Sequence, residues 1–319
     1  MTLADEAPAV RFGQRTVPWS RLGTGVERAM TAEEAIIQAG LDWEVELSPL
    51  YHSLPVDRPE GERKFQQVKD RFAVRRKDTF DVLGTVGSHY VPFQNREAFE
   101  FCDYLVESGE AKYTFCGKAK GGKQIVLVMK FPRGLLVAGQ DAHDLYALLR
   151  TAHDGTKAIS IALTPLRHSC TNVMSLSLYA PEVKQRWAVP HVTNVAGKLA
   201  EARDTLKLTD RYAEEYKKAA DQLAATAMTL DEFEAVLKKV LPDRPKRPET
   251  IKRMQALMTS SPNIHDEHRN TAWGALNAVT EFMDWKRDTR SPEAKFLAAV
   301  DGVNSQVRNR AASLLLRGR

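Results

Sequence analysis

Two short stretches of the sequence combine side chains that could transfer protons or attack a substrate. In the first, His153 and Asp154 lie between Arg150 and Lys157 and precede Gly155. A histidine beside a carboxylate can act as a general base or bind a metal. Adjacent residues of a strand point to opposite faces, so a shared site would need a turn, which the glycine permits. Because one His-Asp pair is a weak motif, we favour a turn in which Asp154 caps backbone groups.

The second stretch, TPLRHSCTN at 164–172, places His168 two residues before Cys170. A thiol beside a histidine could act as a nucleophile. The two side chains share a face only if the chain is extended there, and no oxyanion-binding loop is recognisable nearby. Free cysteines are usually buried apolar residues, so we do not expect nucleophilic catalysis. Arg167 and Asn172 are better explained as hydrogen-bonding groups, either structural or for a ligand.

A segment with many cations and no carboxylate is the most pronounced charge pattern of the chain. It runs from 111 to 140 and contains Lys112, Lys118, Lys120, Lys123, Lys130 and Arg133. Nucleic-acid phosphates bind cations that no nearby carboxylate neutralises. Three of the lysines flank Gly121 and Gly122, and a Gly-Gly turn between apolar runs predicts a hairpin. Tyr113 and Phe115 could stack unpaired bases. An exposed strand edge whose lysines prevent aggregation is an equally good explanation.

Other cations could extend this basic surface. The three cations at 75–77 could belong to the same surface. Alternatively, Asp70 and Asp78 could neutralise them at the entry to a strand. Arg150 and Lys157 could contact a phosphate or a base from the predicted turn. We therefore predict a nucleic-acid interface made of Arg75, Arg76, Lys112, Lys118, Lys120, Lys123, Arg150, Lys157 and Arg167. No metal site and no cofactor are predicted, and no catalytic residue is assigned.

Apolar periodicity indicates the elements that position these side chains. The box from Thr31 to Glu34 predicts the start of a helix. Alternation over 43–47 predicts a half-buried strand. The stretch 141–149 is compatible with either a helix or a strand. The central region should hold a helix at 95–108 and strands at 79–86, 113–116, 124–131, 158–163 and 173–178.

After about residue 190 the apolar spacing changes to three and four residues, which is typical of helices. Helices are predicted over 195–228, 229–241, 249–260, 269–287 and from 292 toward the end. The fold class is therefore α+β, with an N-terminal and central mixed antiparallel sheet with helices, followed by an all-helical C-terminal half. We divide the chain into an N-terminal arm (1–30), a central α+β domain (31–190) and a helical C-terminal region (191–319).

The long helix predicted over 195–228 bears on self-association. At 1.5 Å per residue it would extend roughly 50 Å, farther than a small domain. Its apolar stripe could be covered by the later helices folding back on it, or by a second copy of the chain in a homo-oligomer. The sequence leaves both arrangements open, and the first is the simpler one.

Composition narrows the class of protein. Of the 319 residues, 43% are hydrophobic and 27% are charged, as in soluble globular proteins. No apolar run approaches the roughly 20 residues of a membrane-spanning helix, and the acidic N-terminus is not a secretory signal. Three cysteines without a CxxC pair favour a reducing cytoplasm and argue against a disulfide framework or a structural zinc site. The net charge of +5 is a weak indication of a polyanionic partner.

Several separated motifs occur together in one known family. They are VPWSRLGTGV at 17–26, LGTVGSHYVPFQNREAF at 83–99, HDG at 153–155, TPLRHSCTN at 164–172 and WGALNAVTEFMDW at 273–285. Through them the chain resembles the phage- and plasmid-like proteins of the domain of unknown function 932 over nearly its whole length. The resemblance implies a mobile-element protein that acts in DNA metabolism in the cytoplasm of a bacterial host, and it supplies no catalytic residues. The order of helix, β-hairpins and helices is also distantly similar to that of phage single-strand annealing proteins.

Together these observations predict a non-enzymatic nucleic-acid-binding protein. It would bind DNA, preferably single-stranded, through the basic hairpin, and could promote strand annealing in recombination or replication. Such binding should weaken steeply as the salt concentration rises. Two alternatives belong to other classes of protein. One is an enzyme that acts on a nucleotide or nucleic acid through the 150–172 region, and the other is a non-catalytic protein that binds a partner through its helical C-terminal half.

Overall fold

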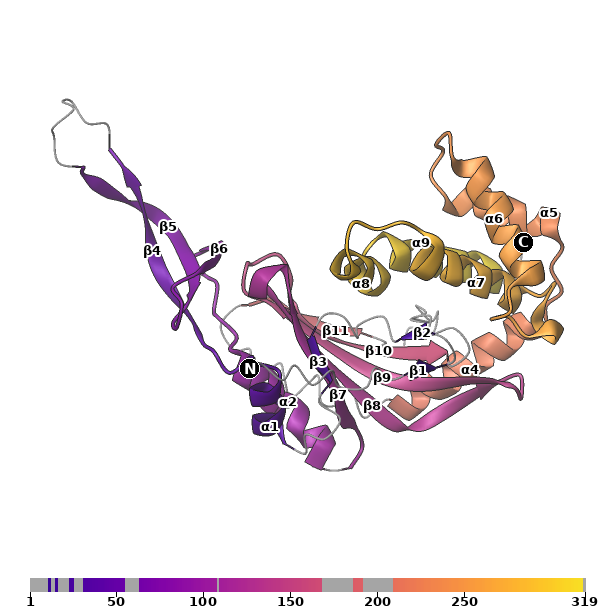
Figure 1. Ribbon diagram of the computed structural model, residues 1–319, viewed down its shortest axis with the longest axis horizontal. Helices are drawn as coiled ribbons and strands as arrows, with labels where there is room; N and C mark the ends of the chain where they lie inside the picture. Colours follow the sequence, from indigo (N-terminus) through magenta and orange to yellow (C-terminus); the bar gives the residue numbers. More distant parts are fainter. Residues whose placement is uncertain are drawn as a thin grey trace, which may run out of the picture.

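A six-stranded antiparallel sheet lies at the centre of the molecule in the computed structural model (Figure 1). The structure describes residues 11–12, 15–16, 23–25, 31–54, 63–107, 109–167, 186–191 and 209–317. The order of strands in the sheet is β11 (Arg186–Val189), β10 (Ile159–Arg167), β9 (Asp141–Ala152), β8 (Gln124–Val137), β7 (Lys112–Ala119) and β3 (Gly23–Gly25). A separate short pair joins β1 (Arg11–Phe12) to β2 (Arg15–Thr16). The predicted α+β fold class is confirmed.

The central strands are buried on both faces. On one face Leu127 and Leu149 belong to the main hydrophobic core, which α1 (Ala32–Gln38) and α2 (Asn95–Glu107) help to cover. On the other face Tyr146 and Leu148 pack against Phe296 of helix α8. Strands that are covered on both faces lose the alternation of apolar and polar residues. This is why 141–149, which forms most of β9, is compatible from sequence with either a helix or a strand.

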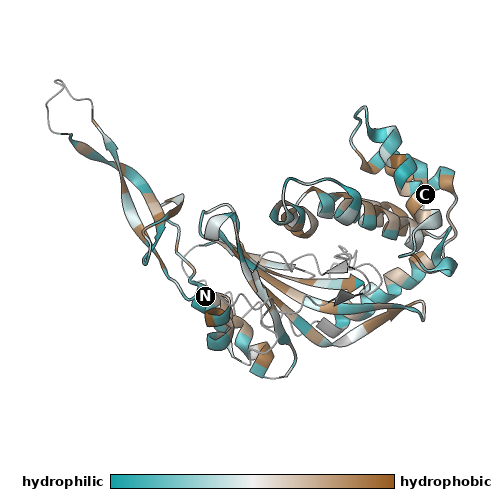
Figure 2. Ribbon diagram, viewed as in Figure 1, coloured by the Kyte–Doolittle hydropathy of each residue, from teal (hydrophilic) through white to brown (hydrophobic). Residues whose placement is uncertain are grey.

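A second, three-stranded antiparallel sheet projects from the body of the molecule (Figure 1). It consists of β4 (Val45–Ser53), β5 (Phe65–Arg76) and β6 (Val82–Gly87). β6 pairs with β5 only from Arg71 to Arg75, so residues 50–54 and 63–70 form a two-stranded section beyond β6. Together with Arg71 we name this section the outer ribbon. Hydrophilic residues alternate with hydrophobic patches along it (Figure 2). No strand is predicted at 65–76, because this section lacks the one-sided burial that produces a regular alternation of apolar and polar residues.

The C-terminal half is helical, as predicted. Its helices are α4 (Thr209–Ala225), α5 (Leu230–Val240), α6 (Arg247–Ser260), α7 (Ala272–Glu281), α8 (Pro292–Asp301) and α9 (Val303–Leu316), with a 3-10 turn at Asp266–His268 and a π-helical turn at Phe282–Lys286. Thr229 forms the predicted capping box, and the Ser291 hydroxyl caps α8. The single helix predicted from 292 is two helices. Gly302 separates them, and a Cβ on it would lie 2.7 Å from the Cα of Ala298.

The described part of the predicted long helix is α4. Its stripe residues Tyr212, Tyr216 and Leu223 are fully buried, and α4 packs against α7 and α9. The later helices therefore cover this part of the stripe, whereas the stripe residues before 209 lie outside the described residues. Self-association stays a prediction. No helix in the described part of the chain combines the length and apolar character needed to cross a membrane.

Candidate nucleic-acid interface

Three of the predicted lysines lie where β7 meets β8, at a site that we name the lysine turn (Lys118, Lys120 and Lys123). The turn is tight, because Lys120, Gly121 and Gly122 have positive φ angles of 53°, 68° and 93°, a region that glycine adopts readily. Lys118 and Lys120 are exposed and Lys123 is half-buried. Within the described residues none of the three lysines has an ion-pair partner. Their charges are therefore available to an anion.

Contacts on two sides hold the lysine turn in place. The backbone N–H of Lys120 donates to the carboxylate of Glu293, at the start of α8, over 2.9 Å. On the side of the three-stranded sheet, a Cβ built on Gly122 would lie 3.6 Å from the ring of Trp43. The guanidinium of Arg76 lies 4.4 Å from the centre of that same ring. The fold thus brings Arg76 and the lysine turn, which are distant in sequence, into one region of the surface.

The predicted His-Asp turn after β9 packs beside the lysine turn. The backbone N–H of His153 donates to the carbonyl of Lys123 over 2.8 Å. The carboxylate of Asp154 accepts from the backbone N–H of Thr156 at 3.0 Å and from its hydroxyl at 2.5 Å. Gly155 has a φ angle of 71°. The structure confirms the interpretation of this segment as a turn capped by Asp154.

The side chain of His153 points into the protein, where its ring contacts Asn95. It is fully buried, and its Nε2 lies 2.9 Å from Oδ1 of Asn95. Burial lowers the pKa of His153 to about 4, so the imidazole is neutral at pH 7. His153 and Asp154 therefore do not form a catalytic pair. His168, Cys170 and Asn172, from the other candidate catalytic stretch, lie outside the described residues.

Carboxylates of the three-stranded sheet and its turn neutralise the cations at 75–77. Each cation has its own partner: Arg75–Glu46 at 2.8 Å, Arg76–Asp78 at 2.5 Å and Lys77–Glu44 at 2.5 Å. The hydrogen bond from Arg76 lowers the pKa of Asp78. Asp70 lies at a bulge with a φ angle of 55° and forms none of these pairs. This cluster is therefore a balanced strand entry, the alternative interpretation, with Asp78 in the role foreseen for it.

The remaining predicted residues differ in position and burial. Lys112 is exposed but lies at the opposite end of β7. Lys157 is half-buried. Arg150 is only 7% exposed, and its Nη2 donates to Oε1 of Gln124 over 3.2 Å. A buried guanidinium cannot reach a phosphate backbone, so the prediction that Arg150 binds nucleic acid is wrong.

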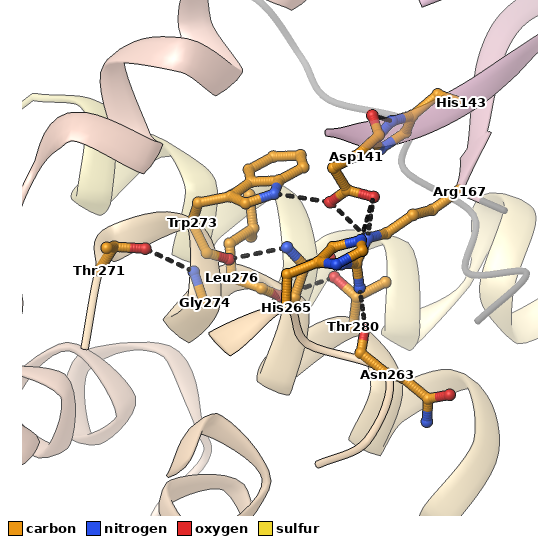
Figure 3. Close-up of polar contacts among 11 residues, drawn as sticks. Asp141, His143, Arg167, Asn263, His265, Thr271, Trp273, Gly274, Leu276 and Thr280 are labelled. Atoms are coloured by element: carbon orange, nitrogen blue, oxygen red, sulfur yellow. Dashed lines mark hydrogen bonds and ion pairs between the residues drawn. The ribbon is translucent and has the colours of Figure 1, made fainter. Parts of the chain in front are cut away.

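The same prediction is wrong for Arg167, whose side chain is fully buried. Its Nε donates to both carboxylate oxygens of Asp141 at 2.7 and 2.6 Å, and its Nη1 donates to the carbonyl of Asn263 at 2.6 Å (Figure 3). The indole N–H of Trp273 donates to Asp141 at 2.9 Å. Burial alone would raise the pKa of Asp141, but the charge of Arg167 holds it below its ordinary value. The cluster joins β9 and β10 to α7, and two of its residues, Arg167 and Trp273, lie in family motifs quoted above.

The aromatic side chains available for stacking are also not those predicted. Tyr113 and Phe115 are 0% and 3% exposed, and the hydroxyl of Tyr113 donates to the carbonyl of Phe99 at 2.9 Å. They belong to the core, so their prediction as base-stacking surfaces is wrong. Tyr51 and Phe65 of the outer ribbon are instead 58% and 62% exposed. No sequence pattern marks them, because without a predicted partner strand neither ring can be placed on a face.

Comparison with known proteins agrees with the motifs quoted above. Residues 82–310 match the family described as Domain of unknown function (DUF932). No curated protein and no solved structure matches the chain. The match covers most of the chain, from β6 through the central sheet into α9, and begins after the β4–β5 ribbon. By this match the chain belongs to the DUF932 family, a family defined by a domain of unknown function.

Proposed function

We propose that this protein binds single-stranded DNA without catalysing a reaction, and that the lysine turn is its primary contact. The observation that supports the proposal is a group of three lysines at the end of a well-packed sheet, none with an ion-pair partner among the described residues. A polyphosphate chain binds such cations because each contact releases condensed counterions. The net charge of +5 favours the same class of partner.

The biological setting follows from the resemblance carried by the sequence motifs. It is that of a phage- or plasmid-encoded protein in the cytoplasm of a bacterial host, acting in recombination or replication. Strand annealing would need several protomers on one strand, because weak phosphate contacts become tight binding only when the binding units are linked. Homo-oligomerisation is therefore a requirement of the annealing proposal and not of the binding proposal.

No specific observation supports either of the two alternative functions. An enzyme acting through 150–172 would need converging reactive groups, but Asp154 caps a turn and His153 points into the core. A partner-binding helical half would need a contiguous apolar surface. The exposed large hydrophobic side chains in its described part are Leu230 and Val303, which are single residues on different helices.

Fluorescence anisotropy of a labelled oligo-dT at low and high salt tests the proposal. The variant with Lys118→Ala, Lys120→Ala and Lys123→Ala should bind more weakly. The slope of log affinity against log salt should also flatten by about 0.7 for each phosphate contact that is lost. The matched control carries Lys218→Ala, Lys239→Ala and Lys252→Ala, which also remove three positive charges, from exposed positions on α4, α5 and α6. It should keep the slope of the wild type.

Two outcomes separate the parts of this proposal. If the wild type does not bind oligo-dT even at low salt, the protein is not a single-strand-binding protein. If the lysine-turn variant and the control variant lose affinity equally, binding is a property of the net charge and the contact does not lie at the lysine turn. A double-stranded competitor of equal length measures the preference for unpaired strands.

A further inference from the structure

The outer ribbon extends away from the rest of the protein, and no described helix or strand lies over either of its faces (Figure 1). Residues 65–67 of β5 pair only with β4, because β6 ends its pairing at Arg71. A two-stranded ribbon is at best marginally stable in water by itself. A protein that maintains such an element and places large aromatic side chains on it therefore presents a surface suited to a ligand.

Two aromatic rings share one face of the outer ribbon. Tyr51 lies opposite Gln67 and Ser53 lies opposite Phe65, and residues that face each other across two strands point to the same side. Tyr51 and Phe65 are thus diagonal neighbours, about 7–8 Å apart. They are 58% and 62% exposed. The other two residues of this face are uncharged and can form hydrogen bonds, so the face offers two flat rings beside polar groups.

The charges of the outer ribbon favour a polyanion. Arg63, Lys64, Lys69 and Arg71 are exposed. None of these four has an ion-pair partner among the described residues. Asp70 is the single carboxylate of the outer ribbon as defined above. The sequence of the connecting loop at 55–62 contains three carboxylates and one arginine, so the positive charge lies along the strands.

The outer ribbon belongs to the sheet whose base lies next to the lysine turn. The three-stranded sheet is anchored at Trp43, whose ring adjoins Gly122 of that turn. Glu44 and Glu46 are neutralised by cations of the same sheet, whereas the exposed Asp42, next to Trp43, has no ion-pair partner among the described residues. A strand of nucleic acid that lies along the ribbon would reach the lysine turn by way of this junction, where the cations Arg75, Arg76 and Lys77 also lie.

We infer that the outer ribbon binds unpaired bases of single-stranded DNA by stacking them on Tyr51 and Phe65. This inference rests on the proposed function and adds a second contact to it. Every base has a π-face, so stacking on aromatic rings is tolerant of sequence. In a duplex those faces are already covered by neighbouring bases. A second copy of the ribbon fits this surface less well, because its cations would be brought against those of the first.

Comparison of oligo-dT with an abasic oligonucleotide of equal length isolates the stacking contribution. The abasic strand keeps the phosphates and lacks the bases, so the full-length wild type should bind it more weakly than oligo-dT. Replacing both rings (Tyr51→Ala with Phe65→Ala) should lower the affinity for oligo-dT by about five-fold to a hundred-fold for each ring. The affinity for the abasic strand and the salt slope should not change.

Two control variants distinguish stacking from an effect on folding. Tyr51→Phe with Phe65→Tyr preserves both rings and should bind oligo-dT like the wild type. Leu230→Ala with Val303→Ala removes exposed apolar side chains from the helical half and should have no effect on binding. Circular dichroism and thermal unfolding of each variant should match the wild type, because the replaced ribbon side chains are more than half exposed.

The possible results separate this inference from the proposed function. If the wild type binds oligo-dT and the abasic strand equally, or if the alanine variant keeps full affinity for oligo-dT, the ribbon does not stack bases and the lysine-turn proposal stands. If the wild type binds neither strand, both proposals fail. If the alanine variant changes the molar mass by light scattering and leaves the DNA affinity intact, the ribbon is an interface between copies and the inference is overturned.

Discussion

Replacing Arg167 with methionine should destabilise the protein strongly, because the carboxylate of Asp141 would stay buried without its main partner (Figure 3). The two side chains are 0% and 1% exposed, and Nε of Arg167 contacts both carboxylate oxygens. Among the described residues, the Trp273 N–H would remain as a direct donor at 2.9 Å, with His265 at 4.0 Å. Removing one partner of a buried ion pair costs about 3–5 kcal/mol. The whole free energy of unfolding of a domain is about 5–15 kcal/mol.

Urea unfolding followed by circular dichroism measures this loss as a lower midpoint. The control is Lys77→Met, which removes an exposed partner of Glu44 and should leave the midpoint unchanged, because exposed ion pairs contribute little. Adding Asp141→Leu to Arg167→Met should recover most of the stability, since a buried pair replaced by apolar side chains is often neutral. A double variant no more stable than the single one would show that the cost arises from packing and not from an unpaired charge.

The destabilisation by Arg167→Met should also depend on pH. In the wild type the pKa of Asp141 lies below its ordinary value. Its contribution to stability is therefore present above the unfolded pKa of about 3.9 and is lost as the pH falls through the lower folded pKa. Without Arg167, burial raises the pKa of Asp141, so the variant is penalised most at neutral pH. The difference in unfolding free energy should shrink on acidification. Equal midpoints at pH 7, or a difference that grows in acid, would refute the reasoning.

Three further predictions concern other parts of the fold. Burial lowers the pKa of His153 and of His191 to about 4. As the pH falls below about 6.5, the unfolded chain therefore binds protons before the folded protein does, and the folded state loses stability. The thermal midpoint should drop between pH 6.5 and 4.5, and a midpoint that does not change over this range would contradict the prediction. Gly84→Ala places a Cβ 2.4 Å from the backbone of the turn after β9 and should lose about 1–3 kcal/mol in urea unfolding. Gly87→Ala meets no atom within 4 Å and should lose less; equal losses would argue against the clash. Thr229→Ala removes the N-cap of α5 and should lower the free energy of unfolding by about 1 kcal/mol, whereas Thr229→Ser should retain it. An unchanged urea midpoint for the alanine variant would mean that the cap does not stabilise the fold.

The elements that sequence analysis located correctly are those determined by local interactions. The helix starts at Thr31, Thr229 and Ser291 depend on hydrogen bonds within one turn of the chain. The hairpin at Gly121 and Gly122 depends on a backbone conformation that few residues other than glycine adopt readily. Among the strands that were missed or left ambiguous are β5 and β9, because one is exposed on the outer ribbon and the other is buried on both faces. In neither strand do apolar and polar residues alternate regularly, so the sequence does not indicate one buried face.

The sequence by itself determined where positive charge is concentrated, how the helices of the second half begin, and which family the motifs resemble. Only the tertiary structure decided which charged and aromatic side chains face solvent. Lys118 and Arg167 are both cations beside apolar strand residues, yet one is exposed at a turn and the other is fully buried against Asp141. Tyr113 is in the core while Tyr51 is exposed. The face on which a side chain lies depends on strand register and on which helices fold back over the sheet. Both are set by contacts between residues far apart in the chain, and no local spacing encodes them.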